Sequence, residues 1–203
     1  MAEKPSPTGF TKNRLEALTD GIFAFAMTLL VLNIEVPDVL PATVPPDIVQ
    51  SLLASLYPDF IHYFIAFALL AGFWLMHHAY FDHFRLIDKR IVILNVISLA
   101  LVAIVPFSTD LADTFSSYPL SAIVLELNVF LIGIVYYTQW RYASCRPHLC
   151  QRLEARHSAL VSRNILILPA ISLIAMAVAF SGVTWSTSIY LVTPIATVLA
   201  SKI

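Results

Sequence analysis

The chain has 203 residues, of which 59% are hydrophobic and only 12% charged, with a net charge of −1 and a mean hydropathy of +0.80. Soluble domains carry about 25% charged residues, so this composition excludes an ordinary soluble domain and indicates a protein embedded in a membrane. The near-neutral charge gives no support to nucleic-acid binding, and we expect no nucleic-acid partner.

Long apolar segments recur along the whole chain, and they are continuous rather than alternating every second residue. A bilayer core takes about 20 apolar residues of helix, and continuous runs favour helices over strands. We therefore expect an all-α, polytopic membrane protein, surrounded by lipid, with one six-helix domain over residues 1–203. The expected helices cover residues 14–36, 54–82, 90–109, 119–141, 158–181 and 183–202.

The basic residues predict the orientation of these helices. They lie at the two termini, between the second and third helices, and between the fourth and fifth. The other loops carry Asp38, Asp47, Asp110 and Asp113 instead. Loops rich in Lys and Arg stay on the cytoplasmic side, so we expect a multi-pass protein of the cell membrane with both termini in the cytoplasm.

The first helix has two different faces. At about 100° per residue, Thr28, Leu29 and Leu32 lie within about 60° of Phe25. These four residues form an apolar stripe with a single hydroxyl, called here the Phe25–Leu32 stripe. Asp20 lies about 140° from Phe25, on another face. The helix therefore presents an apolar face and a face whose carboxylate requires partners inside the protein.

Partners for Asp20 are available at the same depth of the membrane. Trp74, His77 and His78 lie toward the cytoplasmic end of the second helix, and Asn95 toward that of the third. Arg14 is on the first helix itself, about 120° away from Asp20. We expect a polar cluster that joins the first three helices, either as a packing network or with a direct part in permeation.

The stretch "RLEALTDGIFAFAMTLLVL" resembles the signature that opens the first helix of the transmembrane protein 175 family, the endosomal/lysosomal potassium channels, in its bacterial and archaeal branch. The likeness extends to "AMTLLVLNIEVP", to a W-x-x-H-H pattern in the second helix and to six helices in about 200 residues. Leu18 stands where the family usually has Phe. The residues that match the two motifs are Arg14, Leu18, Thr19, Asp20, Gly21, Trp74, His77 and His78.

This resemblance implies a cation channel built from four copies of a six-helix subunit, with the first helix lining the pore. By position, Phe25, Leu29 and Leu32 form apolar rings at the constriction, and Thr28 forms a ring of hydroxyls. Phe25 departs from the family, which usually has Ile or Leu there. The family's polar network implies an anchoring cluster around the first helix, formed by Arg14, Thr19, Asp20, Trp74, His77, His78 and Asn95.

The expected activity is passive and modestly selective transport of potassium ions, without an enzyme reaction, a cofactor or a bound metal. The chain has five glycines, none clustered, and no T-V-G-Y-G segment, which excludes the carbonyl-lined filter of other potassium channels. Potassium ions lose water more readily than sodium ions, so a narrow apolar constriction favours potassium modestly. Apolar rings can also close a pore by dewetting.

Other functions remain open at this point. A proton- or ion-coupled secondary transporter could use Glu126 and Asn128 inside the membrane with His62 near the outer end of the second helix. A membrane metalloenzyme could use the "HHAYFDH" segment, where His78 and Asp82 are four residues apart. A helical membrane scaffold without transport activity is the third alternative.

Overall fold

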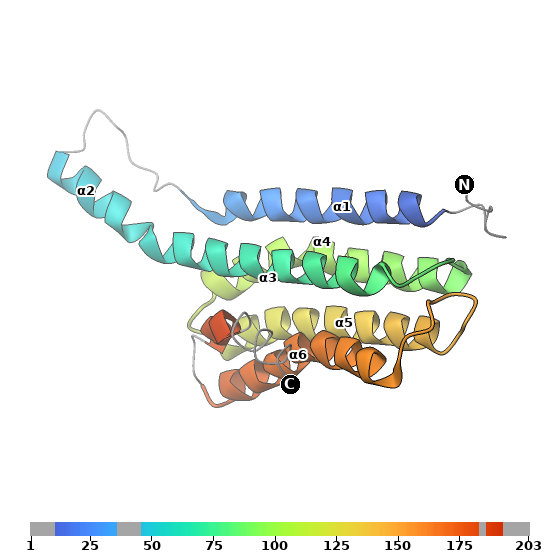
Figure 1. Ribbon diagram of the computed structural model, residues 1–203. Coiled ribbons are helices and arrows are strands. Elements are labelled where there is room, and N and C mark those ends of the chain that lie inside the picture. Colours follow the sequence, from blue (N-terminus) through green and yellow to red (C-terminus); the bar gives the residue numbers. More distant parts are fainter. Residues whose placement is uncertain (1–10, 36–45, 183–185, 193–203) are drawn as a thin grey trace.

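The computed structural model describes residues 11–35, 46–182 and 186–192, and within them the fold is helical apart from one isolated bridge between Phe84 and Cys150. The expected all-α class is confirmed. The elements in chain order are α1 (Lys12–Leu29), the 3₁₀ helix η1 (Leu30–Asn33), α2 (Pro46–Ser55), α3 (Tyr57–Phe81), α4 (Lys89–Thr114), α5 (Pro119–Ser144), α6 (Ala155–Phe180) and the 3₁₀ helix η3 (Ser186–Val192) (Figure 1).

Five stretches of the described chain are helical, long enough and apolar enough to cross a membrane: Lys12–Asn33, Ile48–Phe81, Lys89–Thr114, Pro119–Ser144 and Ala155–Phe180. The sixth expected helix, over residues 183–202, lies largely outside the described residues, and η3 falls within it. Helix α2 begins at Pro46, after the proline-rich segment that follows the first helix, and it leads into α3.

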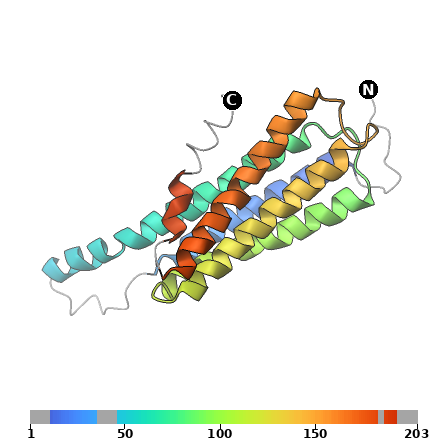
Figure 2. The same ribbon diagram turned by 90° about the horizontal axis from the view of Figure 1, so that it is seen from below.

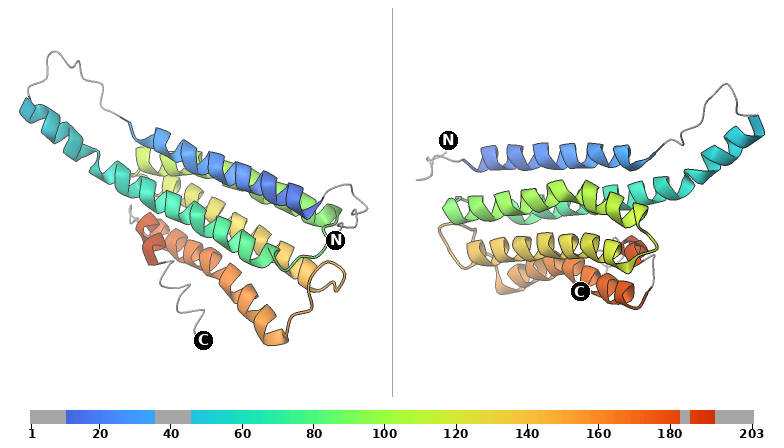
Figure 3. Two further views of the ribbon diagram at one scale, coloured as in Figure 1. Left: turned by 45° about the horizontal axis from the view of Figure 1, so that its top comes forward. Right: turned by 180° about the vertical axis from the view of Figure 1, so that it is seen from behind.

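The long helices run side by side in a bundle (Figures 1 and 2). α1 lies along one edge, where it packs on α4 and α3, and α5 packs on both α4 and α6 toward the opposite edge (Figure 3). α5 and α6 approach closely because Gly133 has no side chain. A Cβ atom placed there would lie 2.3 Å from Cγ of Pro169.

Local chemistry explains several helix ends. The Thr11 hydroxyl accepts from the Arg14 N–H at the start of α1, and the Asp88 carboxylate accepts from the Ile91 N–H at the start of α4. Such side chains satisfy N–H groups that have no partner within the helix. α5 begins at Pro119, because the first turn of a helix tolerates the missing N–H of proline.

Charged residues distinguish the two ends of the bundle. The start of α1, the α3–α4 connection and the α5–α6 connection lie together at one end (Figure 1). The Lys and Arg residues in the described part of the chain belong to these connections or to the helix turns beside them, apart from Arg163, which lies just over two turns into α6. The opposite end, called here the outer end, carries Asp59, Asp110 and Asp113.

Candidate functional site

A buried polar chain joins α1, α4 and α3 near the basic end of the bundle. The Asn95 side-chain amide donates to the Thr19 hydroxyl oxygen at 3.0 Å, and the Asn95 carbonyl oxygen lies 2.9 Å from Nε2 of His77. The Thr19 hydroxyl itself donates to the Leu15 carbonyl. These three side chains are at most 1% exposed. Because the Asn95 oxygen can only accept, Nε2 of His77 must carry the proton in this contact.

Asp20 lies at the rim of this chain rather than inside it. Nε1 of Trp74 donates to Oδ1 of Asp20 at 2.9 Å, and Nε2 of His78 lies 3.4 Å from the same oxygen. The Asp20 side chain is 50% exposed. An ion pair so open to its surroundings contributes little to stability, so the hydrogen bond from Trp74 is the more specific contact.

Of the seven residues assigned to the anchoring cluster, six contact one another in this region and Arg14 does not. Arg14 is exposed one turn before Leu18, and within the described residues its recorded hydrogen bond is the one from its backbone N–H to Thr11. The angle of about 120° between Arg14 and Asp20 around the helix axis already disfavoured a direct pair.

The opposite face of α1 is largely uncovered by the part of the chain that the structure describes. Phe25 is 61% exposed and Leu32 is 71% exposed, Thr28 is exposed, and Leu29 is half-buried. Phe23, Ala26 and Leu30 of the same helix are at most 1% exposed, because they pack against α3 and α4. The Phe25–Leu32 stripe therefore lies on the outward face of the edge helix of the bundle.

Thr28 presents its oxygen in a defined way. Its hydroxyl donates to the Phe25 carbonyl of the same helix at 2.7 Å. The proton is therefore directed at the helix, and the lone pairs of the oxygen are free to face outward. Such an oxygen suits a cation better than an anion.

The outer end of the first helix holds a contact that the sequence analysis missed. The α-helix ends at Leu29, and residues 30–33 continue as the 3₁₀ helix η1, so the regular helix stops short of the expected residue 36. The side-chain amide of Asn33 then donates to the Pro106 carbonyl of α4 at 3.0 Å. In the sequence, an amide residue ends one apolar segment and a proline lies inside another. Nothing in the sequence indicates that these two residues pair.

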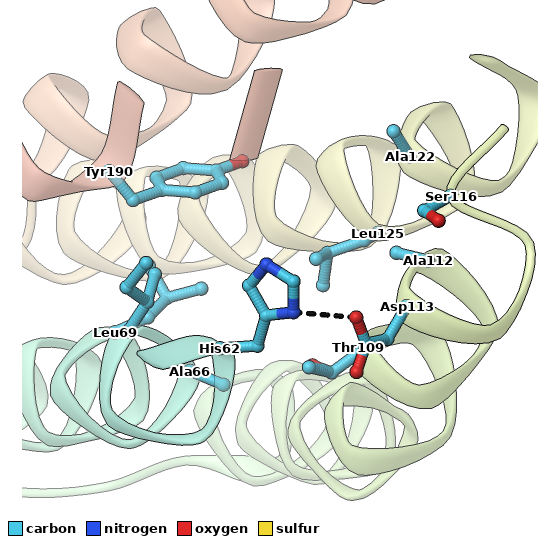
Figure 4. Close-up of a pocket in the computed structure, with 11 residues that line it drawn as sticks. His62, Ala66, Leu69, Thr109, Ala112, Asp113, Ser116, Ala122, Leu125 and Tyr190 are labelled. Carbon is cyan, nitrogen blue, oxygen red and sulfur yellow. Dashed lines mark ion pairs between the residues drawn. The ribbon is translucent and has the colours of Figure 1, made fainter. Parts of the chain in front are cut away.

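A second polar region lies at the outer end, in a cavity of about 180 Å³ between α3, α4, α5 and η3. Nδ1 of His62 lies 2.5 Å from Oδ1 of Asp113. Figure 4 shows His62 pointing from α3 into this cavity, with Asp113 of α4 on one side and Tyr190 of η3 across from it. The pair joins α3 to α4.

The other two residues considered for ion coupling have partners elsewhere. The Ser186 hydroxyl donates to Oε1 of the buried Glu126 at 2.5 Å, which joins α5 to η3. The Asn128 amide donates to the Leu101 carbonyl of α4 at 3.2 Å. Each of these side chains, like His62, therefore joins two elements of the bundle.

Two of the histidines considered for a metal site, His77 and His78, are engaged in other contacts. His77 is bonded to Asn95, and Nδ1 of His78 lies 3.1 Å from the Trp74 carbonyl. In the part of the chain that the structure describes, no three His, Cys, Asp or Glu side chains gather as metal ligands.

Comparison with known proteins gives a consistent result. Residues 14–106 match the family described as endosomal/lysosomal potassium channel TMEM175. A potassium channel of Chamaesiphon minutus is 33% identical over 209 residues, which cover the full length of both proteins. The endosomal/lysosomal proton channel TMEM175 of Homo sapiens is 31% identical over 183 residues, which cover 82% of this chain and 36% of the human protein.

Solved structures agree with these relatives. The crystal structure of a lysosomal potassium-selective channel TMEM175 homolog from Chamaesiphon minutus matches with a TM-score of 0.76 and 29% identity, over 95% of this chain and 98% of that one. A second potassium channel structure, of MtTMEM175, matches with a TM-score of 0.63 at 18% identity, and that likeness concerns the fold alone.

Proposed function

The chain belongs to the TMEM175 family of ion channels, and we propose that it forms a potassium-preferring cation channel from four copies of a six-helix subunit. Family membership makes the protein an ion channel rather than an enzyme. In the proposed assembly the α1 helices of four subunits surround the pore, and potassium ions pass down their gradient.

The observation that carries this proposal is the open face of α1. Burial and polar contacts hold one side of the helix against α3 and α4. The other side presents the Phe25–Leu32 stripe, which is mostly exposed among the described residues of the subunit. A lipid-facing helix needs apolar residues there, but it has no need of the outward oxygen of Thr28, which a cation pathway uses.

The proposed filter combines the size of the apolar rings with partial dehydration. Rings of Phe25, Leu29 and Leu32 narrow the pore around its axis. Cations lose part of their hydration shell when they pass these rings. Thr28 oxygens between the rings replace some of those water contacts. Partial dehydration costs less free energy for potassium than for sodium, so the channel prefers potassium modestly. Dewetting at Leu29 or Leu32 closes the pore.

Potassium is favoured as the permeant ion by the names of the full-length relative from Chamaesiphon minutus and of the Streptomyces collinus potassium channel, which is 29% identical over 67% of this chain. The animal relatives are named proton channels, so proton flux belongs in the same measurements. All of these relatives are called channels, and none of them favours the transporter alternative.

We place the channel in the cell membrane with both termini in the cytoplasm. Lys and Arg gather in the start of α1 and in the α3–α4 and α5–α6 connections, which lie together at one end of the bundle (Figure 1), and this supports the orientation. The basic end then lies on the cytoplasmic side, and the outer end, with His62 and Asp113, faces away from the cytoplasm.

The test is ion flux into liposomes that contain the purified protein, with potassium, sodium and protons measured in parallel. We expect passive potassium flux that exceeds sodium flux. Leu29→Ala and Leu32→Ala widen the constriction, so they should raise the flux or weaken the preference for potassium. Leu173→Ala is the matched control, because Leu173 is 51% exposed on α6 at the opposite edge of the bundle, and it should behave like the wild type.

Two results would overturn the proposal. One is unchanged permeation in both constriction variants when the wild type conducts. The other is flux that saturates and requires a counter-ion gradient, which would favour a coupled transporter. If folded wild-type protein conducts nothing, Phe25→Ala separates an occluded pore, which then opens, from a protein that is not a channel. Native mass spectrometry of the detergent-solubilised protein tests the four-subunit assembly.

A further inference from the structure

We propose that Asn33 is a positioning residue, which directs Leu32 toward the pore by tying the last turn of the first helix to the Pro106 carbonyl of α4. The role of Leu32 in the pore rests on the proposed function. The tie itself stands on the contacts of Asn33, Pro106 and η1 within one subunit.

Pro106 makes α4 an unusual neighbour at this depth. Proline has no N–H, and its ring displaces the carbonyl four residues earlier, so the ladder of helix hydrogen bonds is interrupted around it. The carbonyl that loses its helix donor is that of Val102, four residues before Pro106. The Pro106 carbonyl accepts from the Asn33 amide at 3.0 Å, and earlier in the same helix the Leu101 carbonyl accepts from the amide of Asn128 of α5 at 3.2 Å. Side-chain amides from two different elements therefore dock on the α4 backbone near Pro106.

The segment that Asn33 ties down has a special geometry. Residues 30–33 form a 3₁₀ helix, in which each residue turns by about 120° and rises by about 2.0 Å. Residues three apart then lie one above the other, so Leu32 is directed along nearly the same line as Leu29. If the segment relaxed into an α-helix, at about 100° per residue, Leu32 would rotate by about 60° relative to Leu29.

Asn33 is placed to prevent that rotation. It follows Leu32 directly, and its amide reaches α4 while Leu32 is 71% exposed on the other side. Leu30, two residues earlier, is 1% exposed and packs inward. The 3₁₀ turn is thus held on its inner side by Leu30 and Asn33, and Leu32 is left to project outward.

α4 also holds the first helix at the basic end, where the Asn95 amide donates to the Thr19 hydroxyl. The first helix is therefore aligned against one neighbour at both ends. A substitution at Asn33 should alter the direction of Leu32 and leave the contacts between Asn95 and Thr19 in place.

The experiment compares Asn33→Leu with Asn128→Leu in the liposome assay, with potassium and sodium flux measured for both. Each substitution removes one amide that donates to the α4 backbone near Pro106, with little change in volume, but only Asn33 belongs to the segment that carries Leu32. We expect Asn33→Leu to lose discrimination between potassium and sodium, and Asn128→Leu to keep the wild-type ratio. Asn33→Gln, which retains the donor on a longer side chain, should recover much of the discrimination.

A wild-type flux ratio in Asn33→Leu would overturn the inference, and so would an equal change of the ratio in Asn128→Leu. If Asn33→Leu does not fold, Asn33→Ser takes its place with the same expectation, because serine is too short to reach Pro106.

A second readout does not depend on conduction. In a Cys145→Ser/Cys150→Ser background, Leu32→Cys is modified by a water-soluble thiol reagent, and the rate is measured with and without Asn33→Leu. We expect Asn33→Leu to change this rate and Asn128→Leu to leave it unchanged. A changed rate in protein that conducts neither as the wild type nor as Phe25→Ala would support the tie and refute the channel. An unchanged rate would refute the tie whether or not the protein conducts.

Discussion

The two ends of the first helix are tied to the same neighbour by different chemistry. At the basic end, side chains bond to side chains: Thr19 to Asn95, Asn95 to His77, and Asp20 to Trp74. At the outer end, one side chain, Asn33, bonds to a backbone carbonyl that lies at a proline. The inner tie is a network whose members support one another, whereas the outer tie is a single contact.

This difference assigns different tasks to the two ends. A buried network of three elements resists change, because the loss of one member leaves the others without partners in a low-dielectric interior. A single half-buried contact is easier to break and to form again. We infer that the inner end determines whether the helix is held in the bundle, and that the outer end determines how its last turn is directed.

The largest loss of stability is expected when the packing behind α4 is disturbed, because both ends of the first helix are tied to α4. α4 packs on α5, and α5 is locked to α6 where Gly133 meets Pro169. In Gly133→Ala the new Cβ would lie 2.3 and 2.6 Å from ring atoms of Pro169, so the two helices must separate. We expect a loss of about 3 kcal/mol, the upper part of the range for overpacked cores, measured by unfolding in detergent. Gly72→Ala is the control, because a Cβ there meets no atom within 4 Å, and equal losses in both variants would contradict the assignment.

The next largest loss of stability is expected when Asn95, the central member of the buried network at the basic end, is replaced. Asn95→Leu leaves Nε2 of the buried His77 without an acceptor and the Thr19 oxygen without its donor. We expect a loss of about 2 kcal/mol, since a buried group without a partner costs about 1–3 kcal/mol. Ser98→Ala, one turn along α4, removes a hydroxyl that donates to the Asn95 carbonyl of its own helix, and it should cost clearly less. If both variants unfold at the same point, the network does not hold the first helix.

A smaller effect is expected at the cap of α4 beside the inner end. Asp88 accepts from the Ile91 N–H at 2.9 Å and from the Tyr142 hydroxyl at 2.6 Å. Asp88→Ala should cost about 1 kcal/mol, as the loss of a helix cap does. Asp88→Asn is the control, because its side-chain oxygen can still cap the helix.

The stabilisation by Asp88 depends on pH in a definite direction. Burial alone raises the pKa of its carboxyl, but the hydrogen bonds from Tyr142, Ile91 and Arg90 outweigh burial and lower it. A lowered pKa in the folded state means that the charged form stabilises the fold above the unfolded value of 3.8 and that this contribution disappears as the pH falls below it. The difference in stability between the wild type and Asp88→Ala should therefore shrink below about pH 4. A constant difference would show that the charge of Asp88 has no role.

The inner end was largely predictable from the sequence, whereas the outer end was not. Polar residues in an apolar helix must find partners, and the depth of Thr19, His77 and Asn95 could be counted from the helix ends. The outer tie depends on the backbone, because its acceptor is the Pro106 carbonyl, and a backbone acceptor leaves no pattern in the sequence. The change from α-helix to 3₁₀ helix after Leu29 also has no clear sequence signal.

The exposure of individual residues was only partly predictable. Helical spacing placed Phe25, Thr28 and Leu32 together on one face, and in the subunit this face is open. The same spacing could not show that Asp20 would be half exposed with Trp74 as its donor, or that Arg14 would remain apart from the cluster. These details depend on the tilt between α1 and α3, which periodicity does not contain.

The smallest effect is expected from the charge of Asp20, and it tests the two-ended description most finely. In Asp20→Asn the Trp74 indole can still donate to a side-chain oxygen, and only the attraction to His78 is lost. Because the pair is half exposed, the loss should stay below about 1 kcal/mol. The potassium-to-sodium flux ratio should remain that of the wild type, since Asp20 lies away from the Phe25–Leu32 stripe. If the ratio changes while assembly and stability do not, Asp20 faces the permeation path, and the inner end then shares the task that we assign to the outer end.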